Sequence, residues 1–168
     1  MRATLPSAVS LALLLSSPAF PAQLPACNGE PHRQFDFWVG TWEVRDGSGK
    51  LAGYNTITSE ENGCVLIERW QSAAGHGGMS MNYYDPLSRR WKQNWVSPGV
   101  ILEMSGTVQD GSLILEGPLQ DIDKKQTSLL RGIWTALPDG RVRQHFVESR
   151  DEGKTWNEWF DGYYSRRP

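Results

Sequence analysis

Turn-forming residues recur at short, nearly regular intervals after residue 34, and this spacing constrains the fold more than any other feature of the sequence. The chain can reverse at RDGSGK, EENG, YDPLSRR, QDGS, LPDG and RDEGK, which are rich in Gly, Pro, Asn and Asp. The segments between these turns alternate apolar and polar residues, which is the period of a half-buried strand. The spacing predicts ten strands, at 40–46, 52–59, 64–72, 78–84, 90–97, 100–108, 112–119, 126–137, 140–149 and 155–165.

We therefore expect an all-β fold in which about ten antiparallel strands follow one another as a meander. Closing such a sheet into a barrel removes the unpaired edges that a flat sheet would expose. A barrel of this size has room for a small ligand. A β-sandwich is the alternative architecture.

Tight turns also predict the registers of several hairpins. Asp110-Gly111 suits a two-residue type I′ turn, and the LPDGR and YDPLSRRW segments fix two further hairpins in the same way. The facing pairs expected from these turns are Gln109 with Ser112, Trp134 with Gln144, Gly132 with Phe146, Tyr84 with Trp91, and Asn82 with Gln93.

The first residues are typical of an export signal, because Arg2 precedes the apolar stretch AVSLALLLSSPAF, which is too short to span a bilayer. We expect a signal peptide over 1–22, an N-terminal arm over 23–33 and a single β-barrel domain over 34–168. LPAC is similar to a lipobox ending at Cys27, but it lies beyond the hydrophobic run, so lipid anchoring is the less favoured alternative. The predicted location is periplasmic or secreted.

Cysteine usage and charge narrow the possible partners. An exported chain with two cysteines is expected to pair them, here Cys27 with Cys64. With 17 basic and 19 acidic residues, the chain lacks the positive charge typical of proteins that bind nucleic acid or anionic membranes. We expect a monomer that binds a small hydrophobic molecule, with no cofactor and no membrane insertion after signal removal.

The stretch RQFDFWVGTWEV, with Gly40-Thr41-Trp42, resembles the Gly-x-Trp start of lipocalins and their calycin relatives. Together with GCVLIERW, GMSMNYYDP, RWKQNW and GRVRQHFVESRDEGKTWNEWFDGYYSR, it resembles the DUF1579-like exported bacterial proteins of unknown function. The resemblance covers nearly all the chain after the signal. It implies a lipocalin-type barrel but no established reaction. Trp42 is then expected to plug the closed end of the barrel. Its indole would form a hydrogen bond or stack on an arginine from one of the last strands.

Alternation within LIERW and RWKQNWV places three indoles, one amide and one carboxyl on the same face of their strands. A mostly apolar lining with a few convergent polar groups is what a small-molecule site requires. The main hypothesis is therefore an exported barrel that binds a small apolar or aromatic ligand. The expected ligand-binding residues are Glu68, Trp70, Asn82, Trp91, Gln93, Trp95, Trp134 and Gln144.

An enzyme is the first alternative, with Glu68 or Glu148 as general acid or base inside the barrel, because buried carboxyls acquire raised pKa values unless they are paired. In the alternative interpretation both glutamates have a structural role, and each forms an ion pair with Arg69, Arg131 or Arg143. No catalytic residue or metal ligand is assigned.

A haem-binding barrel similar to nitrobindin is the second alternative, and it requires an inward axial histidine. The three histidines, His32, His76 and His145, show no metal-binding spacing.

The segment SRDEGKTW matches the Asp-box pattern found in sialidase propellers, but a propeller needs several repeats and the chain has one. We expect a structural turn that begins at Ser149. In this turn the Asp151 carboxylate accepts backbone N–H groups, Gly153 takes a positive φ and Trp156 packs beneath.

Overall fold

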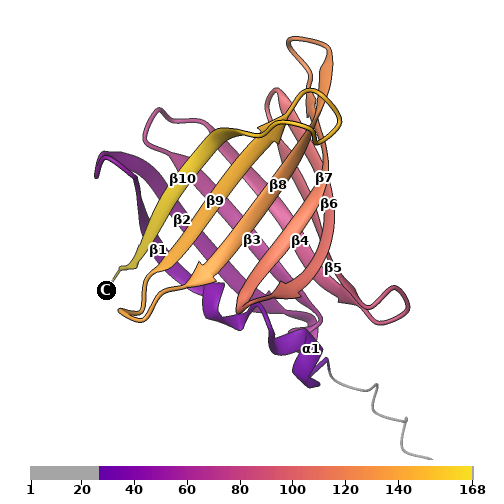
Figure 1. Ribbon diagram of the computed structural model, residues 1–168. Helices are drawn as coiled ribbons and strands as arrows, with labels where there is room; N and C mark the ends of the chain where they lie inside the picture. The colour runs from indigo at the N-terminus through magenta and orange to yellow at the C-terminus, as the bar shows by residue number, and fades with distance from the viewer. Residues whose placement is uncertain (1–26, 168) are drawn as a thin grey trace, which may run out of the picture.

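The ten strands form a closed antiparallel barrel in which each strand pairs with its neighbours in the sequence and β1 pairs with β10 (Figure 1). The structure is a computed structural model, and it describes residues 27–167. The prediction of an all-β barrel is confirmed, and the sandwich alternative is wrong. The strands are β1 (Gly40–Asp46), β2 (Leu51–Glu60), β3 (Val65–Ser72), β4 (Gly77–Asp85), β5 (Arg90–Ser97), β6 (Val100–Gln109), β7 (Ser112–Asp121), β8 (Gln126–Ala136), β9 (Val142–Ser149) and β10 (Asn157–Arg166).

The hairpin registers expected from the turns are confirmed. Asp110 and Gly111 have φ values of 47° and 77°, and a type I′ turn requires a positive φ at both positions. These registers determine which side chains of each strand face the interior. The observed pairs include Gln109 with Ser112, Trp134 with Gln144, Gly132 with Phe146, Tyr84 with Trp91, and Asn82 with Gln93.

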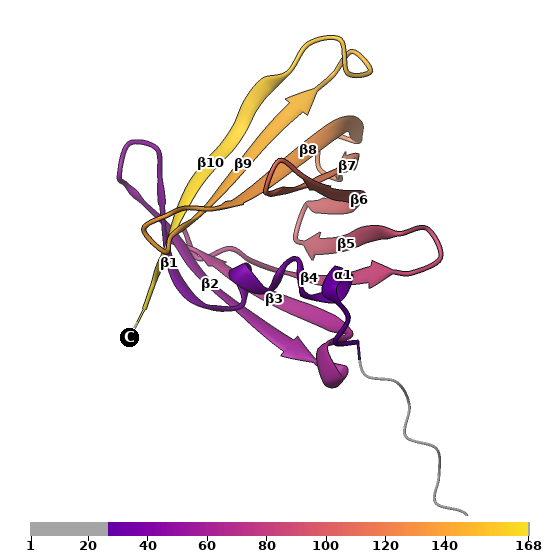
Figure 2. The same ribbon diagram turned by 60° about the horizontal axis from the view of Figure 1, so that its bottom comes forward.

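Aromatic side chains fill one end of the barrel. The helix α1 (Glu30–Arg33) and the 3-10 turn η1 (Asp36–Trp38) lie across this end (Figure 2). A second 3-10 turn, η2 (Glu61–Gly63), joins β2 to β3. We call the buried rings at this end the aromatic plug, and it consists of Phe35, Trp38, Trp42, Trp91 and Trp134.

Within the aromatic plug, Phe35 stacks on Trp38 with 4.7 Å between ring centroids. It meets Trp91 and Trp134 edge-on at 5.6 Å and 5.5 Å. None of the plug rings is more than 2% exposed. The half of the barrel nearest η1 is therefore solid core.

Trp42 has the geometry that the resemblance implies. Its Nε1 donates to the backbone oxygen of Trp38 at 2.8 Å, and the guanidinium of Arg166 on β10 lies 4.4 Å from the indole centroid. Arg166 also donates to the carbonyl of Val39 at 3.1 Å. One side chain thus ties the end of β10 to the segment that closes the barrel.

The disulfide between Cys27 and Cys64 is confirmed, and its Cα atoms lie 4.8 Å apart. It joins the segment before α1 to the start of β3 and indicates an oxidising compartment. Because lipid attachment at Cys27 would need the same sulfur, the bridge disfavours anchoring there. The predicted signal peptide over 1–22 and residues 23–26 of the arm lie outside the described residues.

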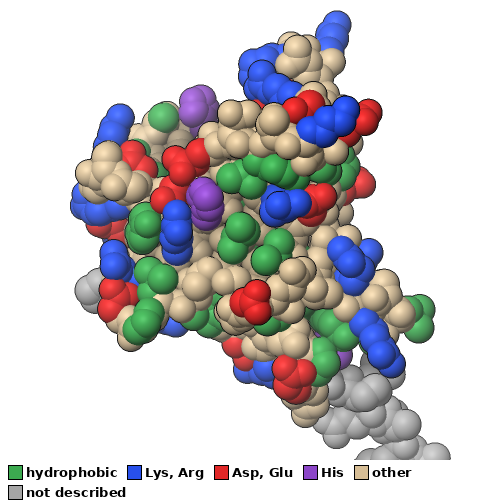
Figure 3. Space-filling view, viewed as in Figure 1, with side chains coloured by type: hydrophobic (Ala, Val, Ile, Leu, Met, Phe, Trp, Pro, Cys, Tyr) green, Lys and Arg blue, Asp and Glu red, His purple; other side chains and the backbone are tan. Residues whose placement is uncertain are grey.

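The outer face of β7 to β10 carries ion pairs. Arg131 pairs with Glu116 at 2.7 Å, and Arg143 pairs with Asp161 at 2.7 Å. Figure 3 shows basic and acidic side chains interspersed over this side of the molecule. None of the helices in residues 27–167 has both the length and the apolar character needed to span a membrane.

Candidate functional site

A cavity of about 250 Å³ occupies the half of the barrel opposite the aromatic plug. Its walls are Trp70, Trp95, Leu102, Phe146 and Phe160. Its rim comes from the loops and strand ends at the far end of the barrel, through His76, Gly77, Ser97, Pro98, Val100 and Trp159. Four side chains line it closer to the plug, and they form its polar floor: Glu68, Gln93, Gln144 and Tyr164.

Inward glycines make room for the aromatic walls. A Cβ atom added at Gly78 would lie 2.2 Å from the Trp95 ring, and one at Gly132 would lie 2.3 Å from the Phe146 ring. Such distances are far inside van der Waals contact, so the rings lie against bare backbone. The glycines therefore keep these two rings close to the sheet and leave the centre open.

A continuous network of buried polar side chains forms the floor and extends beneath it. Asn55 Nδ2 donates to Glu68 Oε1 at 2.7 Å, and Ser80 Oγ donates to Glu68 Oε2 at 2.6 Å. Asn82 Nδ2 donates to Ser80 Oγ at 2.7 Å, and Gln93 Nε2 donates to Asn82 Oδ1 at 2.8 Å. Five side chains from four neighbouring strands, β2 to β5, are thus linked through Glu68.

The opposite side of the floor continues this network. Asn55 Nδ2 also lies 3.3 Å from the hydroxyl of Tyr164, which donates to Gln144 Oε1. Every side chain in the network is at most 5% exposed. Buried amides and hydroxyls need such partners, so the network holds each group in one orientation.

Glu68 is 3% exposed, and no basic side chain in the described part of the chain pairs with it. Burial raises the pKa of Glu68 to about 7, although the hydrogen bonds from Ser80 and Asn55 oppose the shift. Burial also raises the pKa of Tyr164 well above its ordinary value, and the nearby charge of Glu68 adds to this. The floor therefore holds an acid that changes charge near neutral pH.

Five of the eight residues expected to bind ligand line the cavity: Glu68, Trp70, Gln93, Trp95 and Gln144. Asn82 lies beneath them in the network. The expectation that Trp91 and Trp134 line a chamber needs correction, because both belong to the aromatic plug. Phe35 and Trp38 enter that half of the barrel and fill it. A ligand-binding role for the eight residues stays a prediction.

Several lining residues were not predicted from the sequence, and three of them lie on β10. Trp159, Phe160 and Tyr164 belong to a strand whose register with β9 shifts between Glu158 and Phe160. A bulge reverses which residues face inward, so alternation alone could not place them. Phe146, which pairs with Gly132 in the predicted hairpin, was not assigned to the site.

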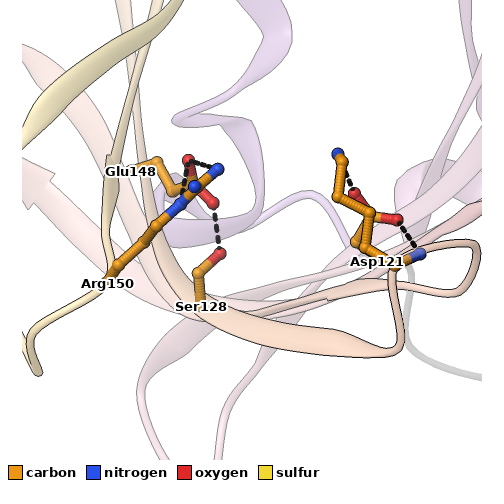
Figure 4. A network of polar contacts seen from close by, with 5 residues as sticks. Asp121, Ser128, Glu148 and Arg150 are labelled. Carbon is orange, nitrogen blue, oxygen red and sulfur yellow. Dashed lines mark hydrogen bonds and ion pairs between the residues drawn. The ribbon is translucent and has the colours of Figure 1, made fainter.

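Glu148, the second carboxylate expected inside the barrel, does not line the cavity. Glu148 faces Leu130 across the ladder near the end of β9, where Ser128 Oγ donates to it at 2.7 Å and Arg150 pairs with it at 3.1 Å (Figure 4). Burial works to raise the pKa of Glu148, but the hydrogen bonds from Ser128 and Arg150 outweigh it and hold the pKa below its ordinary value. Asp121 in the same view makes a separate contact with Lys124.

The histidines do not fit an axial haem ligand. His145 faces outward and lies 3.3 Å from Glu158, and His32 packs edge-on against Tyr84 near the aromatic plug. His76 is exposed at the rim of the cavity. Residues 27–167 also contain no group of three His, Cys, Asp or Glu side chains that could hold a metal ion.

The SRDEGKTW segment is a closed turn at the rim. Asp151 Oδ1 accepts the N–H of Thr155 and the hydroxyl of Ser149, both at 2.8 Å, and Gly153 has a φ of 87°. Trp156 Nε1 donates to the carbonyl of Gly153 at 3.1 Å. These contacts have the form of the structural turn expected from the sequence.

We expect Glu68→Gln to change how the free energy of unfolding depends on pH. Between the ordinary pKa of 4.5 and about 7, the unfolded chain has lost the Glu68 proton while the folded protein keeps it. Rising pH therefore favours unfolding through this window, by about 3 kcal/mol in total. Urea unfolding of both proteins at pH 4.5, 6 and 8 measures this effect. As the pH rises, the free energy of unfolding of the variant should increase by about this amount relative to that of wild type.

The control for this series is Glu103→Gln on β6, which removes an exposed carboxylate from the outer face. It should follow the wild-type pH dependence. If the free energies of unfolding of wild type and Glu68→Gln change with pH in the same way, Glu68 ionises normally in the folded protein.

No protein-family model matches the chain, and no curated protein matches it. The DUF1579-like resemblance therefore stays a prediction.

Proposed function

We propose that the protein binds a small, largely apolar or aromatic molecule in the cavity at the open half of the barrel. The observation that carries this proposal is a void of about 250 Å³ with aromatic walls and a polar floor. Engineered apolar cavities of about 150 Å³ accept benzene, whereas drug-sized ligands occupy about 300–1,000 Å³. A ligand with one ring and a short chain matches this size.

Binding is better supported than catalysis by the groups on the floor. Glu68 is the one carboxyl among the cavity-lining side chains, since Glu148 is paired with Arg150 elsewhere. A general acid or base works on a reacting group that other side chains position. The remaining floor residues are two amides and a phenol that hydrogen-bond within the buried network. The structure of the floor favours orienting a ligand.

Filling the cavity should weaken binding without unfolding the barrel. Leu102→Trp places a larger side chain in the void, and we expect affinity for 3-phenyl-1-propanol to fall about tenfold or more because ligand contacts are lost. Isothermal titration calorimetry measures the affinity. The matched control is Ile101→Trp, which adds the same side chain at the next residue, on the opposite face of β6.

Ile101→Trp should bind the alcohol as wild type does. Equal affinities of wild type and Leu102→Trp would place the ligand outside the cavity. If the wild-type protein binds no phenylpropyl compound of any head group, the proposed function is wrong.

A further inference from the structure

Hydrogen-bond donors converge on Glu68 from two sides of the floor. On one side Gln93 donates to Asn82, Asn82 donates to Ser80 and Ser80 donates to Glu68. On the other side Asn55 donates to the second carboxylate oxygen. Each amide and hydroxyl is oriented with its donor toward the acid, which is the arrangement that supports a negative charge.

The negative charge at this position has no counter-ion within the described residues. The cavity lining contains one acid, Glu68, and no lysine or arginine, and its one histidine, His76, is exposed at the rim. Beside Glu68, the Oδ1 atom of Asn55 is buried and accepts no hydrogen bond. The floor thus offers a carboxylate and lies next to a second acceptor. Burying an ionised carboxylate without a cation costs free energy.

The cavity walls favour a cation as well. Trp70, Trp95, Phe146 and Phe160 line the space above the floor. Aromatic faces attract ammonium groups, and the attraction strengthens where water is excluded. A positively charged nitrogen above Glu68 would meet π-systems around it and a carboxylate beneath it.

We propose that the ligand carries a protonated amine on an apolar or aromatic body, and that the ammonium group binds against Glu68 at the cavity floor. This inference rests on the proposed function and specifies the chemical class of its ligand. The ammonium group supplies the positive charge that the carboxylate lacks and a donor for the Asn55 oxygen beside it. The body of the ligand lies among the aromatic walls toward the rim.

The groups packed around Glu68 limit what else can titrate there. Asn55 on β2, Ser80 and Asn82 on β4, and Gln93 on β5 are uncharged. From β9 and β10 come Gln144 and Tyr164, and Tyr164 stays neutral because burial raises its pKa well above 10.0. Binding of an ammonium group below about pH 7 must therefore displace the Glu68 proton.

Three probes with the same phenyl body separate the possibilities: 3-phenylpropylamine, 3-phenyl-1-propanol and 3-phenylpropanoate. At pH 8 we expect the wild-type protein to bind the amine about tenfold or more tightly than the alcohol, and the carboxylate most weakly, as measured by calorimetry. Below pH 7 the affinity for the amine should fall while that for the alcohol stays constant. Titrations in buffers with different ionisation enthalpies should show one proton released per amine bound at pH 6.

Glu68→Gln should bring the affinity for the amine to within about threefold of that for the alcohol and should remove its pH dependence. Glu103→Gln makes the same charge change on the outer face and should keep the preference. If the alcohol binds as tightly as the amine, or if Glu103→Gln and Glu68→Gln weaken amine binding equally, the amine inference is wrong and the cavity remains a ligand site. If none of the three probes binds to wild type, the proposed function itself fails.

Discussion

Trp38→Ala is expected to lower the free energy of unfolding by about 3–5 kcal/mol, the range seen when a large buried aromatic is truncated. Trp38 is fully buried, stacks on Phe35, and packs edge-on against Trp134 at 5.9 Å. Its removal leaves a void in the aromatic plug. Urea unfolding followed by far-UV circular dichroism measures the loss.

The control for this variant is Trp159→Ala, which removes the same side chain from the rim, where Trp159 is 45% exposed. That change should cost less than about 1 kcal/mol, as is usual at the surface. Similar losses for the two variants would mean that the plug contributes no more to stability than a rim contact.

The double variant Cys27→Ser/Cys64→Ser should lower the free energy of unfolding by about 4 kcal/mol on the chain-entropy account of a loop of this length. The two cysteines lie 37 positions apart, and the bridge holds the segment before α1 against the start of β3. In the variant the unfolded chain regains the freedom that the bridge removes. Chemical denaturation of the oxidised wild type and of the variant measures the difference.

A reducing agent supplies the matched test. It should bring wild type to the stability of the double variant and leave the variant unchanged. If reduction leaves the wild-type unfolding midpoint where it was, the bridge does not stabilise the fold.

The barrel could be predicted from sequence because its turns are short and local. Asp110-Gly111 permits few turn geometries, and once the turn is fixed, the two-residue period of β6 and β7 determines which side chains face inward. The same reasoning placed Asn82 and Gln93 on one inner face. Each of these assignments depends on residues close together in the chain.

The candidate site was predicted only in part because its remaining determinants are not local. The bulge after Glu158 leaves no turn signature, so the inward residues of β10 were missed. Residues 35–38 have no strand period, and only the folded chain shows that they fill the half of the barrel that holds Trp91 and Trp134. Glu148 shares the inward parity of its strand, yet it lies near the strand's end, where Arg150 reaches it.

The pairing of β1 with β10 has a consequence for the order in which the protein can fold. All the other pairings join strands that are adjacent in the sequence. A growing chain can therefore form hairpins as it is synthesised, but its sheet stays open. Until Asn157–Arg166 has been made, β1 and β9 each present an unpaired edge on which another chain could add a strand. Ring closure is therefore a late event, and the intermediates before it are the species most exposed to aggregation.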